Sequence, residues 1–245
     1  MFRFDNRFLY IFLIAFIIMN VFQNLSSGNF LLSLVLTLPA VLIAITFHEY
    51  AHAWAATKLG DDTPRMQGRL TLNPIAHLDP LGTVLLVFAG FGWGKPVVVN
   101  PRNYDSKMSM TKADALVSFA GPCMNFILAI VFTILLYAIH TFSPAFEFTQ
   151  IGAIIMLLLQ ITVTINIGLG VFNLIPLPPL DGSKILSHFL SYNARQWFEE
   201  HEYFFYIAFL LIWITGIGGY IISPAINGIY TGLNYLVSAI FTLFS

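Results

Sequence analysis

The chain has 245 residues, of which 58% are hydrophobic and 9% are charged. Soluble domains carry about 25% charged residues, so this composition indicates a polytopic membrane protein. The net charge of -1, without any basic cluster, excludes a nucleic-acid partner, and the single cysteine, Cys123, excludes an internal disulfide and a CxxC motif.

Six apolar segments have lengths suited to crossing a bilayer core of about 30 Å. We predict spans near residues 8–22, 30–59, 113–139, 151–175, 203–222 and 225–244. The first segment is followed by further spans, so we interpret it as a retained helix and not as a signal peptide. Only Ser223 and Pro224 separate the last two, which predicts a tight helical hairpin. The expected fold is therefore one all-α membrane domain over residues 1–245.

The distribution of basic residues predicts the orientation, because loops on the cytoplasmic side are enriched in lysine and arginine. With six spans and a cytoplasmic N-terminus, every basic residue falls on the cytoplasmic side. These residues are Arg3, Arg7, Lys58, Arg65, Arg69, Lys95, Arg102, Lys107, Lys112, Lys184 and Arg195. The sequence thus predicts a multi-pass protein of the cell membrane.

A shorter apolar run lies between the second and third spans, from Leu81 to Gly92. Its length of about 12 residues suits a re-entrant or interfacial element better than a span. The run is rich in β-branched and aromatic residues, and glycines follow it in "GFGWGK" before "PVVV". This composition predicts a small membrane-associated β-hairpin over Leu81 to Val99.

Two histidines and a glutamate lie inside the second span, where His48, Glu49 and His52 spell HExxH. On a helix, residues four apart share one face, so both imidazoles can bind one zinc ion. Glu49 is adjacent and can act as the general base for a zinc-activated water. Ionisable residues are costly within a bilayer, which makes a merely structural role for this cluster less favourable.

A catalytic zinc needs a third protein ligand. His77 and His188 lie on the predicted cytoplasmic side, but the stronger candidate is Asp181 in "NLIPLPPLDGSK". The three prolines of that stretch end the preceding helix, and Gly182 permits close packing beside the carboxylate. The alternative is that Asp181 caps a helix in a plain juxtamembrane turn.

These residues resemble the site-2 protease family of intramembrane zinc metalloproteases. The resemblance rests on HEYAH at His48 to His52 and on "NLIPLPPLDG" from Asn173 to Gly182. Three further stretches, "GRLTLNP", "GWGKPVVVNP" and "AGPCMN", are also similar, and the likeness runs from about Ala40 to Lys184. The chain has no room for the PDZ or CBS domains of some relatives, so it resembles a compact form.

The resemblance implies one zinc per chain, held by His48, His52 and Asp181, with Glu49 as general base. It also implies that the enzyme cleaves a transmembrane segment of a membrane-protein substrate, and that Asn125 lies by the active site and binds substrate or oxyanion. An interhelical structural role for Asn125 is the alternative. A metal-ion transporter using the same His and Asp cluster is the rival function.

Overall fold

The structure is a computed structural model that describes residues 30–80, 82–83, 94–105 and 107–244. The described part is mostly helical and contains no β-strand. The longer helices are α2 (Phe30–Lys58), α5 (Met110–Phe142), α7 (Gln150–Asn173), α10 (Glu202–Ile214) and α11 (Ile217–Phe241). The shorter ones are α3 (Thr63–Met66), α6 (Pro144–Glu147), α8 (Asp181–Phe189) and α9 (Tyr192–Glu200), with 3-10 turns at Pro74–His77 and Pro101–Asn103.

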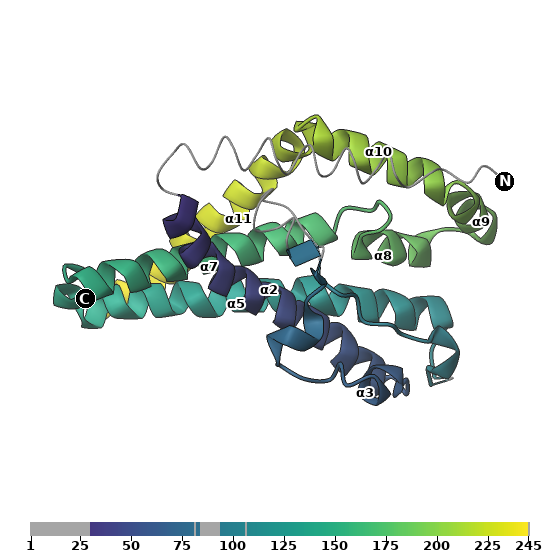
Figure 1. The fold of residues 1–245 in the computed structure, drawn as a ribbon, viewed down its shortest axis with the longest axis horizontal. Helices are drawn as coiled ribbons and strands as arrows, with labels where there is room; N and C mark the ends of the chain where they lie inside the picture. The colour runs from purple at the N-terminus through teal and green to yellow at the C-terminus, as the bar shows by residue number, and fades with distance from the viewer. Residues whose placement is uncertain (1–29, 81, 84–93, 106, 245) are drawn as a thin grey trace.

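Three of the described helices, α2, α5 and α7, are long and apolar enough to cross a membrane. The pair α10 and α11 adds a fourth crossing if the two helices form one bent span, since they meet at an angle of 80°. Figure 1 shows α5 and α7 lying lengthwise beside each other, with α2 running across them. The protein is therefore an integral membrane protein built around this helical bundle.

The bundle has a small apolar core, and many of its large apolar side chains lie outside. Ala129, Val163 and Ile167 form its centre, and Ile226 of α11 packs against them. Large apolar residues such as Phe119 and Ile130 of α5 are exposed, as expected for side chains that face lipid. The bundle thus holds α2 firmly against α5 and α7, which positions the HExxH stretch in the interior.

The predicted spans at 30–59, 113–139 and 151–175 correspond to α2, α5 and α7. Capping residues explain where two of these helices begin. The side chains of Ser109 and Thr149 accept hydrogen bonds from backbone N–H groups in the first turns of α5 and α7. The predicted span at 8–22 lies outside the described residues.

The predicted hairpin turn at Ser223 and Pro224 is wrong. Helix α11 runs through both residues, and the break falls at Thr215 and Gly216. Gly216 has φ of 76°, a left-handed conformation that ends α10 and that glycine adopts without steric cost. The prediction of six spans is therefore not confirmed.

The β-hairpin predicted over Leu81 to Val99 lies mostly outside the described residues, which omit 81 and 84–93. In the part that is described, one isolated antiparallel bridge joins Leu78 to Gly94. Residues 95–100 continue from it without regular secondary structure. The hairpin stays a prediction.

The C-terminal end of the chain lies beside the end of α5. The ring of Phe241 meets that of Phe142 edge to face, with centroids 6.1 Å apart, at the opposite end of α5 from Lys112. In Figure 1 the C-terminus lies far from α8 and α9. If α10 and α11 cross the membrane once, a cysteine at Leu243 in a Cys123-free variant should label from the side opposite to a cysteine at Lys95. Labelling is measured with a membrane-impermeant maleimide. If both cysteines are labelled from the same side, α10 and α11 cross the membrane separately.

Candidate metal centre and active site

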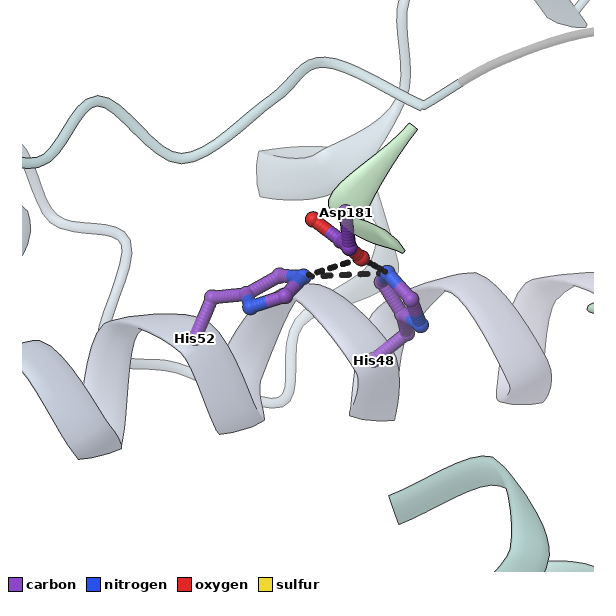
Figure 2. Close-up of side chains that lie close together, drawn as sticks. All are labelled: His48, His52 and Asp181. Carbon is purple, nitrogen blue, oxygen red and sulfur yellow. Dashed lines mark hydrogen bonds and ion pairs between the residues drawn. The ribbon is translucent and has the colours of Figure 1, made fainter. Parts of the chain in front are cut away.

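Helix α2 brings His48 and His52 onto one face, one helical turn apart (Figure 2). Their Nε2 atoms are 3.0 Å apart, and their rings meet edge to face with centroids separated by 4.6 Å. Both side chains are buried. The spacing of HExxH and the helical geometry therefore point both imidazoles at one place inside the bundle.

Asp181 reaches the same place from a different part of the chain (Figure 2). Helix α7 ends at Asn173, the proline-containing residues 174–180 form turns and bends, and Asp181 begins α8. Its Oδ2 atom lies 3.2 Å from Nε2 of His48 and 3.2 Å from Nε2 of His52. Gly182 is required at this turn, because a Cβ atom there would lie 2.4 Å from the carbonyl oxygens of Leu174 and Ile175.

The hydrogen bonds of the two rings leave the Nε2 atoms available as ligands. His48 donates from Nδ1 to Oδ1 of Asn125 at 2.7 Å, and His52 donates from Nδ1 to the carbonyl of Val117 at 2.7 Å. In neutral imidazoles each Nε2 then carries a lone pair. Two lone pairs and a carboxylate therefore face each other in a buried space.

This donor set fits a zinc ion. Oδ2 of Asp181 is buried without a hydrogen-bond partner among the described residues, which is unfavourable unless a cation lies beside it. The separations of 3.0 to 3.2 Å are close to the roughly 3.3 Å between ligand atoms around a tetrahedral zinc. His48, His52 and Asp181 also form the one group in the described residues that is suited to hold a metal ion.

Asn125 lies behind His48 and is fully buried. Besides accepting from His48, it donates from Nδ2 to the carbonyl of Ala44 at 3.1 Å and to Oδ1 of Asn166 at 3.0 Å. All of its hydrogen-bonding groups are thus directed at the protein. The predicted role in substrate binding stays untested, whereas its contact with His48 is that of a residue that orients a metal ligand.

Gly121 provides the space that the two histidines occupy. A Cβ atom at this position would lie 2.4 Å from Nε2 of His52 and 2.7 Å from Cε1 of His48. The glycine of "AGPCMN" is therefore needed for a steric reason that the sequence motif alone did not reveal.

Glu49 lies at the edge of a cavity of about 380 Å³ beside the histidines. Its Oε2 atom accepts a hydrogen bond of 2.9 Å from the backbone N–H of Val97. The cavity is lined mainly by apolar side chains, together with His48, His52 and Asp181. Among the apolar lining residues are Ile45, Val97, Val99, Val117, Leu169 and Phe172.

The two histidines that were considered as alternative ligands do not join the group. His77 is fully buried, and its Nε2 lies 2.7 Å from the carbonyl of Thr71. His188 lies 3.4 Å from the hydroxyl of Thr111. Asp181 is therefore the residue that accompanies His48 and His52.

Comparisons with known proteins agree with this geometry. The model of Peptidase family M50 matches residues 36–215. A Bacillus subtilis protein, YwhC, named as a candidate zinc metalloprotease, is 41% identical over 208 residues, which cover 85% of this chain and 92% of that protein. A similarly named Mycobacterium tuberculosis protein, Rip2, is 30% identical over 206 residues, covering 82% of this chain and 72% of the relative.

A shorter match joins the chain to the regulator of sigma E protease of Haemophilus influenzae, which is 30% identical over 132 residues. It covers 49% of this chain and 29% of that protein. No solved structure gives a significant match.

A His and Asp cluster on apolar helices, with a glutamate beside it, defines a membrane zinc metalloprotease of the site-2 class. The chain belongs to peptidase family M50. The metal-ion transporter that the same cluster also suggested is not favoured by these relatives.

Proposed function

We propose that this protein is an intramembrane endopeptidase that hydrolyses a peptide bond in or near a transmembrane segment of another membrane protein. One zinc ion is held by His48, His52 and Asp181. The observation that carries this proposal is the convergence of three donor atoms, including an unpartnered carboxylate oxygen, inside a membrane helix bundle. The single domain over residues 1–245 and the cytoplasmic position of the site belong to the same proposal.

When bound, zinc acts as a Lewis acid that lowers the pKa of a water molecule to about 7. Glu49 takes the proton of the attacking water and passes it to the nitrogen of the departing amine. The N–H of Val97 donates to Oε2 and so helps to fix the orientation of the Glu49 carboxylate. Asn125 and the Val117 carbonyl hold the histidine rings in the required orientation.

The cavity suits an extended apolar segment better than an intact helix. Its wall includes Pro96, Val97 and Val99, which follow the isolated bridge at Gly94 without pairing to another strand in the described residues. A substrate helix must unwind before its peptide carbonyl can reach Glu49, and addition of an unwound strand to residues 95–99 would stabilise it there. The expected substrates are therefore membrane proteins whose transmembrane segments unwind easily.

The orientation follows from the ends of the helices. The described lysines and arginines belong to the end of α2, the connection from α2 to α5, the start of α5, and the α8 and α9 region. Antiparallel packing of α2, α5 and α7 places these segments at one end of the bundle, as Figure 1 shows. By the positive-inside tendency this end faces the cytoplasm, and water reaches the site from there.

Removal of the metal tests the proposal. Purified protein should contain one zinc per chain, and a chelator should abolish cleavage of a reconstituted membrane substrate, because water then lacks its activating Lewis acid. Added zinc should restore cleavage. Metal content is measured by mass spectrometry and cleavage by gel electrophoresis. Cleavage by metal-free protein at the rate of the loaded protein would contradict the mechanism.

A further inference from the structure

Two segments between α2 and α5 pack against each other beside the active site. The first segment, residues 69–78, begins with the arginine of "GRLTLNP", and the second segment, residues 94–100, contains "GKPVVVN". Leu78 and Gly94 form an antiparallel bridge, and the N–H of Lys95 donates to the carbonyl of His77 at 2.8 Å. The proposed mechanism uses the second segment but assigns no role to the first.

Arg69 joins the two segments. Its Nη1 donates to the carbonyl of Ala76 in the first segment, and its Nη2 donates to the carbonyl of Lys95 in the second. Arg69 is 4% exposed. Burial of a cation is costly, and two interactions offset that cost: the hydrogen bonds to both carbonyls and a longer-range attraction to the Glu49 carboxylate.

The second segment also contacts Glu49, close to Lys95 in the chain. Val97, two residues further on, donates its N–H to Oε2 of Glu49 at 2.9 Å. Gly94 is pressed against α2, since a Cβ atom there would lie 2.7 Å from the side chain of Ile45. The position of Lys95 therefore sets the position of the Val97 N–H, which donates to the Glu49 carboxylate.

The far end of the second segment is fixed by Asp61, which follows α2 and is fully buried. The N–H of Asn100 donates to Oδ2 of Asp61 at 2.6 Å, and Nδ2 of Asn103 donates to Oδ1 at 2.9 Å. Burial by itself would raise the pKa of Asp61, but hydrogen bonds from Thr63, Asn100 and Asn103 outweigh it and lower the pKa. The segment is thus tied at both ends, with Val97 between them.

We propose that Arg69 is a positioning residue for catalysis: by fixing the carbonyl of Lys95 it places the Val97 N–H against Glu49 and keeps the second segment open to the substrate. The inference rests on the proposed endopeptidase function. Arginine is specifically suited to this task, because its planar guanidinium holds two carbonyls from different segments in a fixed geometry, whereas the single ammonium of lysine does not.

The test compares Arg69→Gln and Arg69→Lys with the native protein in proteoliposomes. Arg65→Gln is the matched control, because the Arg65 side chain is 61% exposed and makes a surface ion pair with Asp62. The assay measures kcat and KM for a membrane substrate, zinc content, and crosslinking of substrate to a photoreactive amino acid at Val98, which is exposed.

Arg69→Gln should lower kcat by about 10- to 100-fold, the effect typical of misplacing a catalytic group by about 1 Å. It should weaken crosslinking at position 98 and leave zinc bound at His48, His52 and Asp181. Arg69→Lys should keep the charge and fall between Arg69→Gln and the native protein. The Arg65→Gln control should match the native protein in all three measurements.

Either of two results would overturn the inference. One is cleavage by Arg69→Gln, or by Arg69→Lys if the glutamine variant does not fold, at a rate within about twofold of native. The other is loss of zinc together with cleavage in both variants, which would make Arg69 a residue of the general fold. Glu49→Gln is measured in parallel, because its full activity would refute the endopeptidase mechanism separately from the role of Arg69.

Discussion

Replacement of Glu49 by glutamine should abolish proteolysis and leave the protein folded and zinc-loaded. Glutamine keeps the shape of the side chain and still accepts a hydrogen bond from Val97, which lies 2.9 Å from Oε2 in the native protein. A neutral amide cannot take the proton of the attacking water or deliver it to the departing amine. Positioned acid and base groups contribute roughly 10²- to 10⁴-fold, so cleavage should fall by that factor.

The experiment measures cleavage and zinc content of Glu49→Gln in proteoliposomes, with Glu199→Gln as control. Glu199 is an exposed carboxylate on α9, outside the cluster of His48, His52 and Asp181. The control should cleave at the native rate. If Glu49→Gln cleaves nearly as fast as native protein, Glu49 is not the base. Zinc flux into liposomes through both the native and the Glu49→Gln protein would favour the transporter instead.

Replacement of Asp181 by alanine should release the metal. It removes the one carboxylate among the three converging side chains proposed as ligands, whose Oδ2 lies 3.2 Å from Nε2 of each histidine. Loss of an outer-shell partner typically lowers metal affinity by about 10- to 100-fold, and loss of a direct ligand should lower it further. Zinc titration with a fluorescent competitor measures the change, and proteolysis should fall in parallel because the remaining two ligands hold zinc too weakly.

Asp62→Ala provides the matched control for this substitution. Asp62 is a carboxylate near the end of α2 whose side chain is 53% exposed, and its ion pair with Arg65 lies at the surface. Its removal should leave zinc affinity unchanged. Full zinc occupancy in Asp181→Ala at the native affinity would contradict the ligand assignment and would return attention to His77 and His188.

The sequence predicted well those features that depend on residues close together in the chain. The HExxH motif on a helix places His48 and His52 on one face, and the three closely spaced prolines within residues 173–182 predicted the end of the preceding helix and the approach of Asp181. The structure brings these three residues together. Long apolar runs likewise predicted α2, α5 and α7 close to their observed bounds.

The sequence was less informative wherever a residue's role depends on its partner. Asn125 was recognised as a residue near the site, but its contact with His48 joins positions 77 residues apart. Arg69 was recognised as part of a motif, but the two carbonyls that it holds lie 7 and 26 residues away. Neither contact produces a periodic pattern in the sequence that could predict it, because neither arises within a single helix.

The last two helices illustrate the same division. Composition indicated that residues 203–244 are apolar and helical, and Pro224 suggested a turn, yet α11 continues through Pro224 and the chain bends at Gly216. By itself the sequence determined the membrane class, the helical segments and the chemical groups of the site, because these follow from side-chain type and helical period. Only the tertiary structure decided which way the rings are turned, what holds the segment beside Glu49, and where the last helices break, because those depend on contacts between distant residues.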